Sequence, residues 1–327
     1  MLRGCIRLRL RNNSGFIRKE DRQIKRNPNC ITTYDPITYL FGTADGVKLY
    51  ADVYGSGGNH PRPVIVYLHG GALIMGSRKG IPPALVEFCR EQGYIAVSVD
   101  YRLAPESKLP AILDDLQRAF RWVREEGPTL FGADPARLAA VGHSAGGYLS
   151  LLSGHRVTPR IAAIVSYYGY GDIMGPWYSR PDPFYCSQPA VPREEALSAV
   201  QPHPLADDPG DAARGKFYLY CRQQGCWPQE ILSADPTLDP AAFFPFCPER
   251  NVTPDYPPIL LLHGTADTDV PYGLSVSMAD ALTRAGVVHE LITIRDGEHG
   301  FIHDTGNPQV IAAEERVRIF LRHYLGS

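Results

Sequence analysis

Long apolar runs are absent from this sequence. No stretch of 18 or more apolar residues occurs, so we expect no transmembrane helix and no stable membrane insertion. The N-terminal region also lacks the apolar segment of a secretory signal. The net charge of the 327 residues is only −2, which gives no electrostatic reason to expect nucleic acid as a partner. The sequence therefore indicates a globular protein, and we find no internal repeat or low-complexity segment in it.

Paired cysteines are also lacking. The seven cysteines are odd in number and form no Cys-x-x-Cys pair, which argues against a zinc site and against an obligatory disulfide framework. Four of them lie between 186 and 247, so a disulfide there stays open. Reduced thiols are the default for a cytoplasmic protein, the location that we expect. We expect no metal and no cofactor.

Acidic residues are scarce at the N-terminus. None precedes Glu20, whereas arginine and lysine are frequent. Such a segment is compatible with a transit peptide, or with an arm that binds nucleic acid or a membrane surface. We expect instead that residues 1–30 form a disordered basic leader outside a folded domain of residues 31–327.

Strand and helix signals alternate along most of the chain. The runs 63–68 and 94–99 are almost entirely apolar, as in strands that are buried on both faces. Segments 37–44 and 47–54 flank Asp45-Gly46, a hairpin signal. The pattern predicts an α/β protein with a mostly parallel central sheet, helices on both faces and an antiparallel hairpin at the N-terminal edge.

Residues 174–255 interrupt this alternation after the sixth predicted strand. A structureless loop of this length is improbable in a compact domain. We therefore expect an inserted cap or lid over the carboxyl edge of the sheet, where α/β sheets bind ligands. Its aromatic side chains suit an apolar acyl or aryl pocket, or else the insertion's own core; they are Trp177, Tyr178, Phe184, Tyr185, Trp227, Phe243, Phe244 and Phe246.

The sequence GHSAGG at 142–147 is the most informative motif. It lies between the apolar run 138–141 and a segment that can be helical, so Gly-x-Ser-x-Gly occurs in a strand–turn–helix context. Gly142 and Gly146 would relieve crowding in the tight turn. The Ser144 hydroxyl would then stand above the sheet at a helix N-terminus, in the position of a nucleophile.

A serine nucleophile needs a base, and the base needs a carboxylate. His299 follows the last predicted strand and is our candidate for the base. Asp267 follows the strand 259–262 and is our candidate for the acid, with Asp269 as the rival. The order Ser, Asp, His along the chain is the one expected of the α/β-hydrolase arrangement.

Acyl transfer also needs donors for the oxyanion. The backbone N–H of Ala145, directly after the serine, is one candidate. Gly70 and Gly71 follow the strand 64–68 and supply the others, because glycines let backbone N–H groups turn toward a substrate.

Together these segments resemble the α/β-hydrolase superfamily, in particular carboxylesterases similar to hormone-sensitive lipase and its bacterial esterase relatives. The resemblance implies the α/β-hydrolase fold for residues 31–327. It also implies a catalytic triad of Ser144, His299 and Asp267. Further matching segments are YRLAPE at 101–106, which looks structural, HGTAD at 263–267 and EHGF at 298–301.

The leading hypothesis is a serine carboxylesterase that hydrolyses short- to medium-chain esters, aryl esters among them, through an acyl-enzyme. Ala72-Leu73, His143 and the position of the insertion depart from that branch, and feruloyl-esterase-like and kynurenine-formamidase-like relatives share such features. A small amidase or arylformamidase with the same triad is the alternative. A non-catalytic ligand-binding protein is a third. We expect a small ester as the partner and leave a homodimer open.

Overall fold

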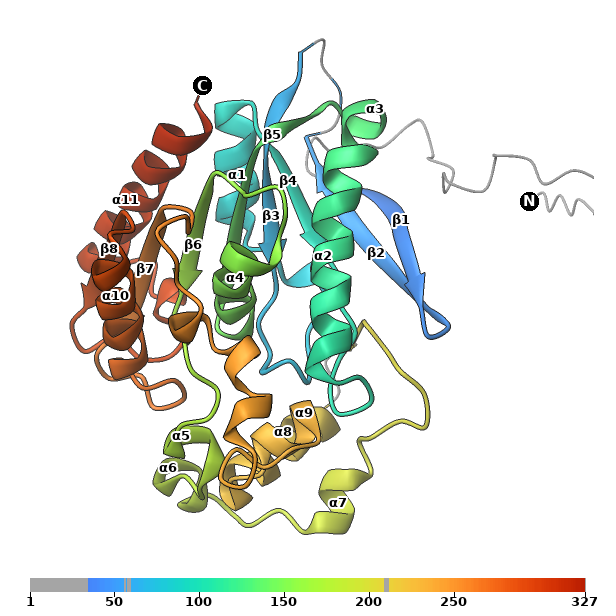
Figure 1. Ribbon diagram of the computed structural model, residues 1–327, viewed down its shortest axis with the longest axis vertical. Coiled ribbons are helices and arrows are strands. Elements are labelled where there is room, and N and C mark those ends of the chain that lie inside the picture. The colour runs from blue at the N-terminus through green and yellow to red at the C-terminus, as the bar shows by residue number, and fades with distance from the viewer. Residues whose placement is uncertain (1–34, 56, 58–59, 209–211, 327) are drawn as a thin grey trace, which may run out of the picture.

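The computed structural model describes residues 35–326 except 56, 58–59 and 209–211, and the predicted leader lies outside this range. In the described part, eight strands form one sheet in the order β1-β2-β4-β3-β5-β6-β7-β8 (Figure 1). The strands are Ile37–Ala44 (β1), Val47–Tyr54 (β2), Arg62–Leu68 (β3), Ile95–Val99 (β4), Ala133–His143 (β5), Ala163–Tyr167 (β6), Ile259–Gly264 (β7) and His289–Ile294 (β8).

Helices connect most of these strands. They are Pro83–Gln92 (α1), Leu109–Glu125 (α2), Gly127–Phe131 (α3), Ala145–Arg156 (α4), Pro176–Ser179 (α5), Pro183–Cys186 (α6), Arg193–Leu197 (α7), Ala212–Gln224 (α8), Trp227–Leu232 (α9), Gly273–Ala285 (α10) and Pro308–Leu325 (α11).

The sheet confirms the predicted fold class. β1 and β2 form an antiparallel hairpin, and β2 is also antiparallel to β4. The other neighbouring strands are parallel. Asp45 and Gly46 turn the hairpin with φ of 47° and 78°, the left-handed backbone that an Asp-Gly turn of this kind requires.

Two apolar layers enclose the sheet. Alternate residues of β3 point to opposite faces, so Val64 and Val66 pack with the layer that contains α2, α4 and α10. Ile65 and Tyr67 pack instead with the layer that contains α1 and α11. This alternation places helices on both faces, as the run of strand and helix signals predicts.

In the described residues, every secondary-structure element between β6 and β7 is a helix. This segment lies beyond the carboxyl ends of the strands (Figure 1). We call residues 174–255 the insertion. Its helices α5, α6 and α9 escape prediction because each spans only four to six residues and starts beside a proline, which is too short for a 3.6-residue pattern. The helix α7 is likewise short and spans only five residues.

Most of the insertion's aromatic side chains pack into a core. Tyr178, Trp227 and Phe243 have almost no exposed surface, and Tyr178 stacks between Trp177 and Trp227 at ring-centroid distances of 3.6 and 3.9 Å. By contrast, Phe184 and Phe244 are exposed. The buried aromatic side chains of the insertion therefore belong to the same apolar layer as α2, α4 and α10.

Two further observations concern the whole described chain. None of its helices combines the length and apolar character needed to cross a bilayer. The five cysteines in the described residues are free thiols, and they are Cys89, Cys186, Cys221, Cys226 and Cys247.

Candidate active site

Ser144 occupies a sharp turn between β5 and α4. Its φ of 56° and ψ of −121° lie in a sparsely populated region for a residue with a side chain, a form of strain that is frequent at functional sites. Close packing explains the flanking glycines. A Cβ atom on Gly146 would lie 1.9 Å from the carbonyl oxygen of Leu68, and one on Gly142 would lie 2.1 Å from the carbonyl oxygen of Gly146.

His299 lies on the loop after β8 and contacts both other members of the predicted triad. Its Nε2 is 3.1 Å from the Ser144 Oγ, and its Nδ1 is 2.8 Å from the Asp267 Oδ2. Tyr168 packs edge-on against the imidazole at a centroid distance of 4.6 Å. Residues that are 155 positions apart in the chain thus form one continuous hydrogen-bonded line.

Asp267 is held by the loop that follows β7. Its side chain is fully buried, and its Oδ1 accepts hydrogen bonds from the backbone N–H groups of Asp269 and Val270. The Nε2 of His263 lies 3.2 Å from its Oδ2. Burial alone would raise the pKa of Asp267, but its hydrogen bonds with His263 and His299 hold that pKa well below the ordinary value. Asp267 is therefore ionised at neutral pH.

The pKa of His299 is raised. Burial alone would lower it, and Arg222 also lowers it, but the hydrogen bond to Asp267 and the charges of Asp269 and Asp267 outweigh both effects. The Asp267 contact also fixes the neutral tautomer, because a carboxylate at Nδ1 requires the proton there and leaves the Nε2 lone pair facing Ser144. We assign this tautomer from the contacts.

The loop with Gly70 and Gly71 passes directly beside Ser144. A Cβ atom on Gly70 would lie 3.4 Å from the Ser144 Cβ. Gly71 has φ of 108°, and a Cβ there would meet the Met75 carbonyl oxygen at 2.2 Å. Ala145 is the first residue of α4, so its N–H has no partner within the helix. Gly70 and Ala145 therefore lie beside the serine, and Gly71 follows Gly70 in the same loop.

The same loop is supported from two sides. Ala72 and Leu73 both have positive φ, 55° and 63°, which costs on the order of 1 kcal/mol for each residue. The Trp227 indole N–H donates to the Ala72 carbonyl at 3.0 Å, and the Tyr101 hydroxyl donates to the His69 carbonyl at 2.8 Å. The insertion and the 101–106 segment together hold the strained backbone, in line with the structural role that the sequence suggests for the latter.

Asp269, the rival acid, lies on the other side of the imidazole. Its Oδ2 is 3.4 Å from the His299 Nε2, the nitrogen that faces Ser144, whereas Asp267 contacts Nδ1. Of the two carboxylates, Asp267 therefore has the contact that the orienting acid of the predicted triad would make.

Several residues near the site are not predicted by the sequence motifs. His263 is buried and bridges Asp267 to Ser275, whose Oγ is 2.7 Å from its Nδ1; its place four residues before Asp267 was the available signal. Arg222 of the insertion contacts Asp269, and nothing in its local sequence marks it. His143 is a buried ring stacked on Tyr167 at 4.3 Å, and burial lowers its pKa to about 3, so it stays neutral.

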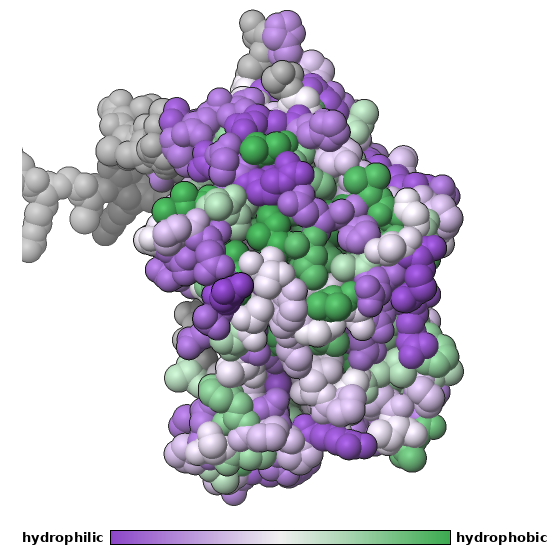
Figure 2. Space-filling model, turned by 90° about the vertical axis from the view of Figure 1, so that its left-hand side faces the viewer, coloured by the Kyte–Doolittle hydropathy of each residue, from purple (hydrophilic) through white to green (hydrophobic). Residues whose placement is uncertain are grey.

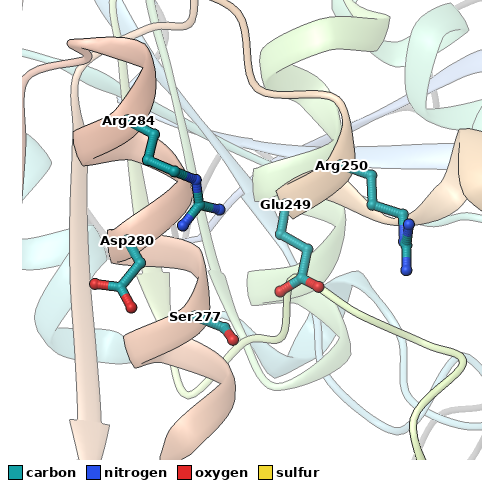
Figure 3. A pocket seen from close by; sticks show the side chains of 5 residues that line it. All are labelled: Glu249, Arg250, Ser277, Asp280 and Arg284. Carbon is teal, nitrogen blue, oxygen red and sulfur yellow. The ribbon is translucent and has the colours of Figure 1, made fainter.

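Two cavities lie away from the triad. One, of about 880 Å³, opens between α1 and α11 and has His143 and Tyr167 in its wall. Figure 2 views the α10 and α11 side of the molecule and shows apolar patches among polar surface. The other, of about 410 Å³, lies between the Pro248–Arg250 turn (η4) and α10. Figure 3 shows its polar lining: Glu249 and Arg250 on one side, and Ser277, Asp280 and Arg284 on α10.

Proteins of known structure share this fold. A search of solved structures finds a protein with unknown function from Staphylococcus aureus, with 25% identity, a TM-score of 0.72, and coverage of 88% of this chain and 99% of that one. It also finds the esterase Est2 of Thermogutta terrifontis with propionate bound, at 20% identity and a TM-score of 0.63, covering 90% and 97%. At that identity the likeness shows the fold alone.

Among curated proteins, the chain is 28% identical over 347 residues to the non-reducing polyketide synthase ausA of Emericella nidulans. The match covers 88% of this chain but 14% of the synthase, so the chain spans about one seventh of that relative's length.

The family profile described as alpha/beta hydrolase fold matches residues 65–303, well over half of the sequence. This range contains the serine turn, the glycine loop and both candidate carboxylates, so the match covers the described site. The chain therefore belongs to the alpha/beta hydrolase fold family.

Proposed function

We propose that this protein is a serine carboxylesterase. The proposal rests on one observation above all, the line of contacts from the Ser144 Oγ through His299 to the buried carboxylate of Asp267. Each contact has the geometry that its role requires, since both distances lie within hydrogen-bond reach and the acid is ionised. The fold family, which is shared with esterases among the structural neighbours, supports the same reaction class.

In the acylation step the Ser144 Oγ attacks the ester carbonyl while the His299 Nε2 takes the serine proton. The negative charge on the carbonyl oxygen is received by the backbone N–H groups of Gly70, Gly71 and Ala145. The imidazolium then returns the proton to the alcohol oxygen, and the C–O bond breaks. Asp267 keeps its charge throughout and stabilises the imidazolium.

Deacylation repeats these roles with water in place of serine. The neutral His299 removes a proton from water, which attacks the acyl carbon, and the Ser144 Oγ leaves with that proton. The products are a carboxylic acid and a regenerated serine, so no cofactor or metal is required by this reaction scheme.

The substrate that we propose is a small ester with a short- to medium-chain or aryl acyl group. Hydrolysis of a p-nitrophenyl ester series from acetate to palmitate tests this. We expect kcat/KM to be highest among the short and medium chains and to fall for palmitate. Matched p-nitroanilides should react much more slowly. If no ester is hydrolysed but an amide is, the amidase alternative replaces the proposal, and if neither reacts a ligand-binding protein does.

The pH dependence follows from the raised pKa of His299. Only the neutral imidazole can take the serine proton, so kcat/KM falls as pH drops through the pKa of His299 in the free enzyme. Because that pKa is raised, the midpoint of the acid limb should lie above pH of about 6.5, the ordinary value for histidine. A pH–rate profile with an uncharged ester measures it. A plateau that extends well below pH 6 would contradict this description of the site.

A further inference from the structure

Arg222 is a buried cation that the insertion places next to the candidate active site. It lies on α8, and its side chain has no exposed surface. Its Nη2 is 2.7 Å from the Asp182 Oδ2, and its Nη1 donates to the Asp269 Oδ1 at 2.5 Å and to the Asp269 carbonyl at 3.0 Å. A buried cation is stable only if anionic partners compensate for its lost hydration. Asp182 and Asp269 are the two carboxylate partners of Arg222.

The two oxygens of Asp269 have different surroundings. Oδ1 accepts three hydrogen bonds, from the Tyr185 hydroxyl at 2.8 Å, the Tyr218 hydroxyl at 2.5 Å and the Arg222 guanidinium. Oδ2 instead faces the His299 Nε2 at 3.4 Å. The insertion therefore binds one side of this carboxylate, while the other side is directed at the atom that would hold the proton during catalysis.

The contact between Oδ2 and Nε2 depends on the protonation state of His299. In the neutral ring Nε2 carries a lone pair, which a carboxylate cannot bind. In the imidazolium Nε2 carries a proton. The Nε2–H can then donate a hydrogen bond either to the Ser144 oxygen, which is 3.1 Å away, or to Asp269. Asp269 thus favours the charged ring, and too strong an attraction would keep the proton from the leaving alcohol.

We propose that Arg222 and Asp269 form a positioning pair that sets how readily His299 accepts and returns the serine proton. Asp269 stabilises the imidazolium. Arg222, which belongs to the insertion, weakens this stabilisation because its positive charge interacts with the same carboxylate. The proton moves from the Ser144 Oγ to Nε2 and on to the alcohol oxygen, and neither member of the pair gains or loses one. The pair acts through His299, so this inference rests on the proposed function.

Other groups around the ring are accounted for. In the part of the chain that the structure describes, several ionisable or charged groups interact with His299 or Asp269, and they are Ser144 at the turn, His143 on β5, Tyr168 and Tyr170 after β6, Tyr178 on α5, Tyr185 on α6, Tyr218 and Arg222 on α8, and Asp267 on the β7–α10 loop. The hydroxyls of Tyr185 and Tyr218 are already donors to Asp269. Asp267 contacts the opposite nitrogen. The attraction for a proton at Nε2 is therefore set mainly by Asp269 and Arg222.

Opposite shifts of the acid limb of kcat/KM test the pair. Asp269→Asn keeps the shape and an oxygen for the three donors but removes the charge, so the limb should move to lower pH by about one unit. Arg222→Met leaves the charge of Asp269 unshared, so the limb should move to higher pH by about one unit. In the double variant, the Arg222 substitution should have a smaller effect, because Arg222 acts through Asp269.

Lys216→Met is the matched control, since Lys216 is an exposed cation on the same helix and pairs with Glu195. Its acid limb should stay in place. The proposal is wrong if the acid limb of kcat/KM stays in place in both test variants, or if it moves in the same direction in both. Arg222 would then have only a structural role. If Arg222→Met does not fold, Tyr218→Phe removes one donor to Asp269 and should raise the limb by a smaller amount.

An NMR titration of the His299 imidazole, assigned with His299→Asn, repeats the test without turnover. The pKa of His299 should fall in Asp269→Asn and rise in Arg222→Met. If these shifts occur but the wild type hydrolyses no ester, the proposed function fails and the pair stands. If the wild type hydrolyses esters but the shifts do not occur, the pair fails and the proposed function stands.

Discussion

Replacing Ser144 by alanine is expected to lower kcat for ester hydrolysis by about a millionfold, the scale of loss seen when a triad nucleophile is removed. The reason is that no other oxygen in the described chain is placed to attack while its proton passes to the His299 Nε2, which lies 3.1 Å from the Ser144 Oγ. The measurement is kcat with a p-nitrophenyl ester, alongside thermal unfolding of both proteins.

Ser153→Ala provides the matched control. Ser153 lies on α4 nine residues after the nucleophile, is buried, and donates to the Ser150 carbonyl at 2.6 Å. Its loss should leave kcat within a few fold of the wild type. A Ser144→Ala protein that is folded and retains most of its esterase activity would show that the nucleophile lies elsewhere.

Replacing Asp267 by asparagine should lower kcat by about 10⁴-fold. An amide at this position can donate to Nδ1, which favours the tautomer whose Nε2 carries the proton and cannot act as a base. The buried amide would also lose the charge that stabilises the imidazolium. The rate is measured at the optimum pH of each variant, so that a shifted pH profile is not mistaken for a lost rate.

Two other variants make this result specific. Asp280→Asn removes an exposed carboxylate on α10 and should leave the rate near that of the wild type. Asp269→Asn should cost far less at its own optimum than Asp267→Asn. The reverse order, with Asp269→Asn losing 10⁴-fold and Asp267→Asn little, would make Asp269 the orienting acid.

The centre of the sheet was predictable because its strands are buried on both faces. The runs around β3 and β4 are apolar at nearly every position, and this pattern is difficult to mistake for an amphipathic helix. The Asp45-Gly46 turn fixed the hairpin, since Asp-Gly accepts the left-handed backbone that such a turn needs.

The site was predictable as far as local turns determine it. Gly142 and Gly146 mark a turn whose backbone leaves no room for a side chain, so the position of Ser144 could be inferred from sequence. Asp267 was preferred to Asp269 from sequence, but the positions of the two carboxylates around His299 could not be inferred. They lie two residues apart on one loop, and only the three-dimensional structure reveals that they contact opposite nitrogens of His299.

The contribution of the insertion was beyond sequence reasoning. Arg222 meets Asp269 across 47 positions, so the contact depends on how α8 of the insertion lies against the loop after β7. Tyr185 was a candidate for an apolar pocket or core at most, and Tyr218 was not among the candidates, whereas the hydroxyls of both bind the carboxylate next to His299. Long-range polar contacts of this kind produce no local periodicity in the sequence, so no sequence pattern predicts them.

In the proposed reaction Ser144 forms a covalent acyl-enzyme. The most direct measurement is to quench the protein with acid during turnover of p-nitrophenyl butyrate and to locate any added acyl group by peptide mass mapping. We predict one butyryl group on the peptide that contains Ser144, and none in Ser144→Ala. Turnover without any acylated peptide, or with the acyl group on another side chain, would contradict the account.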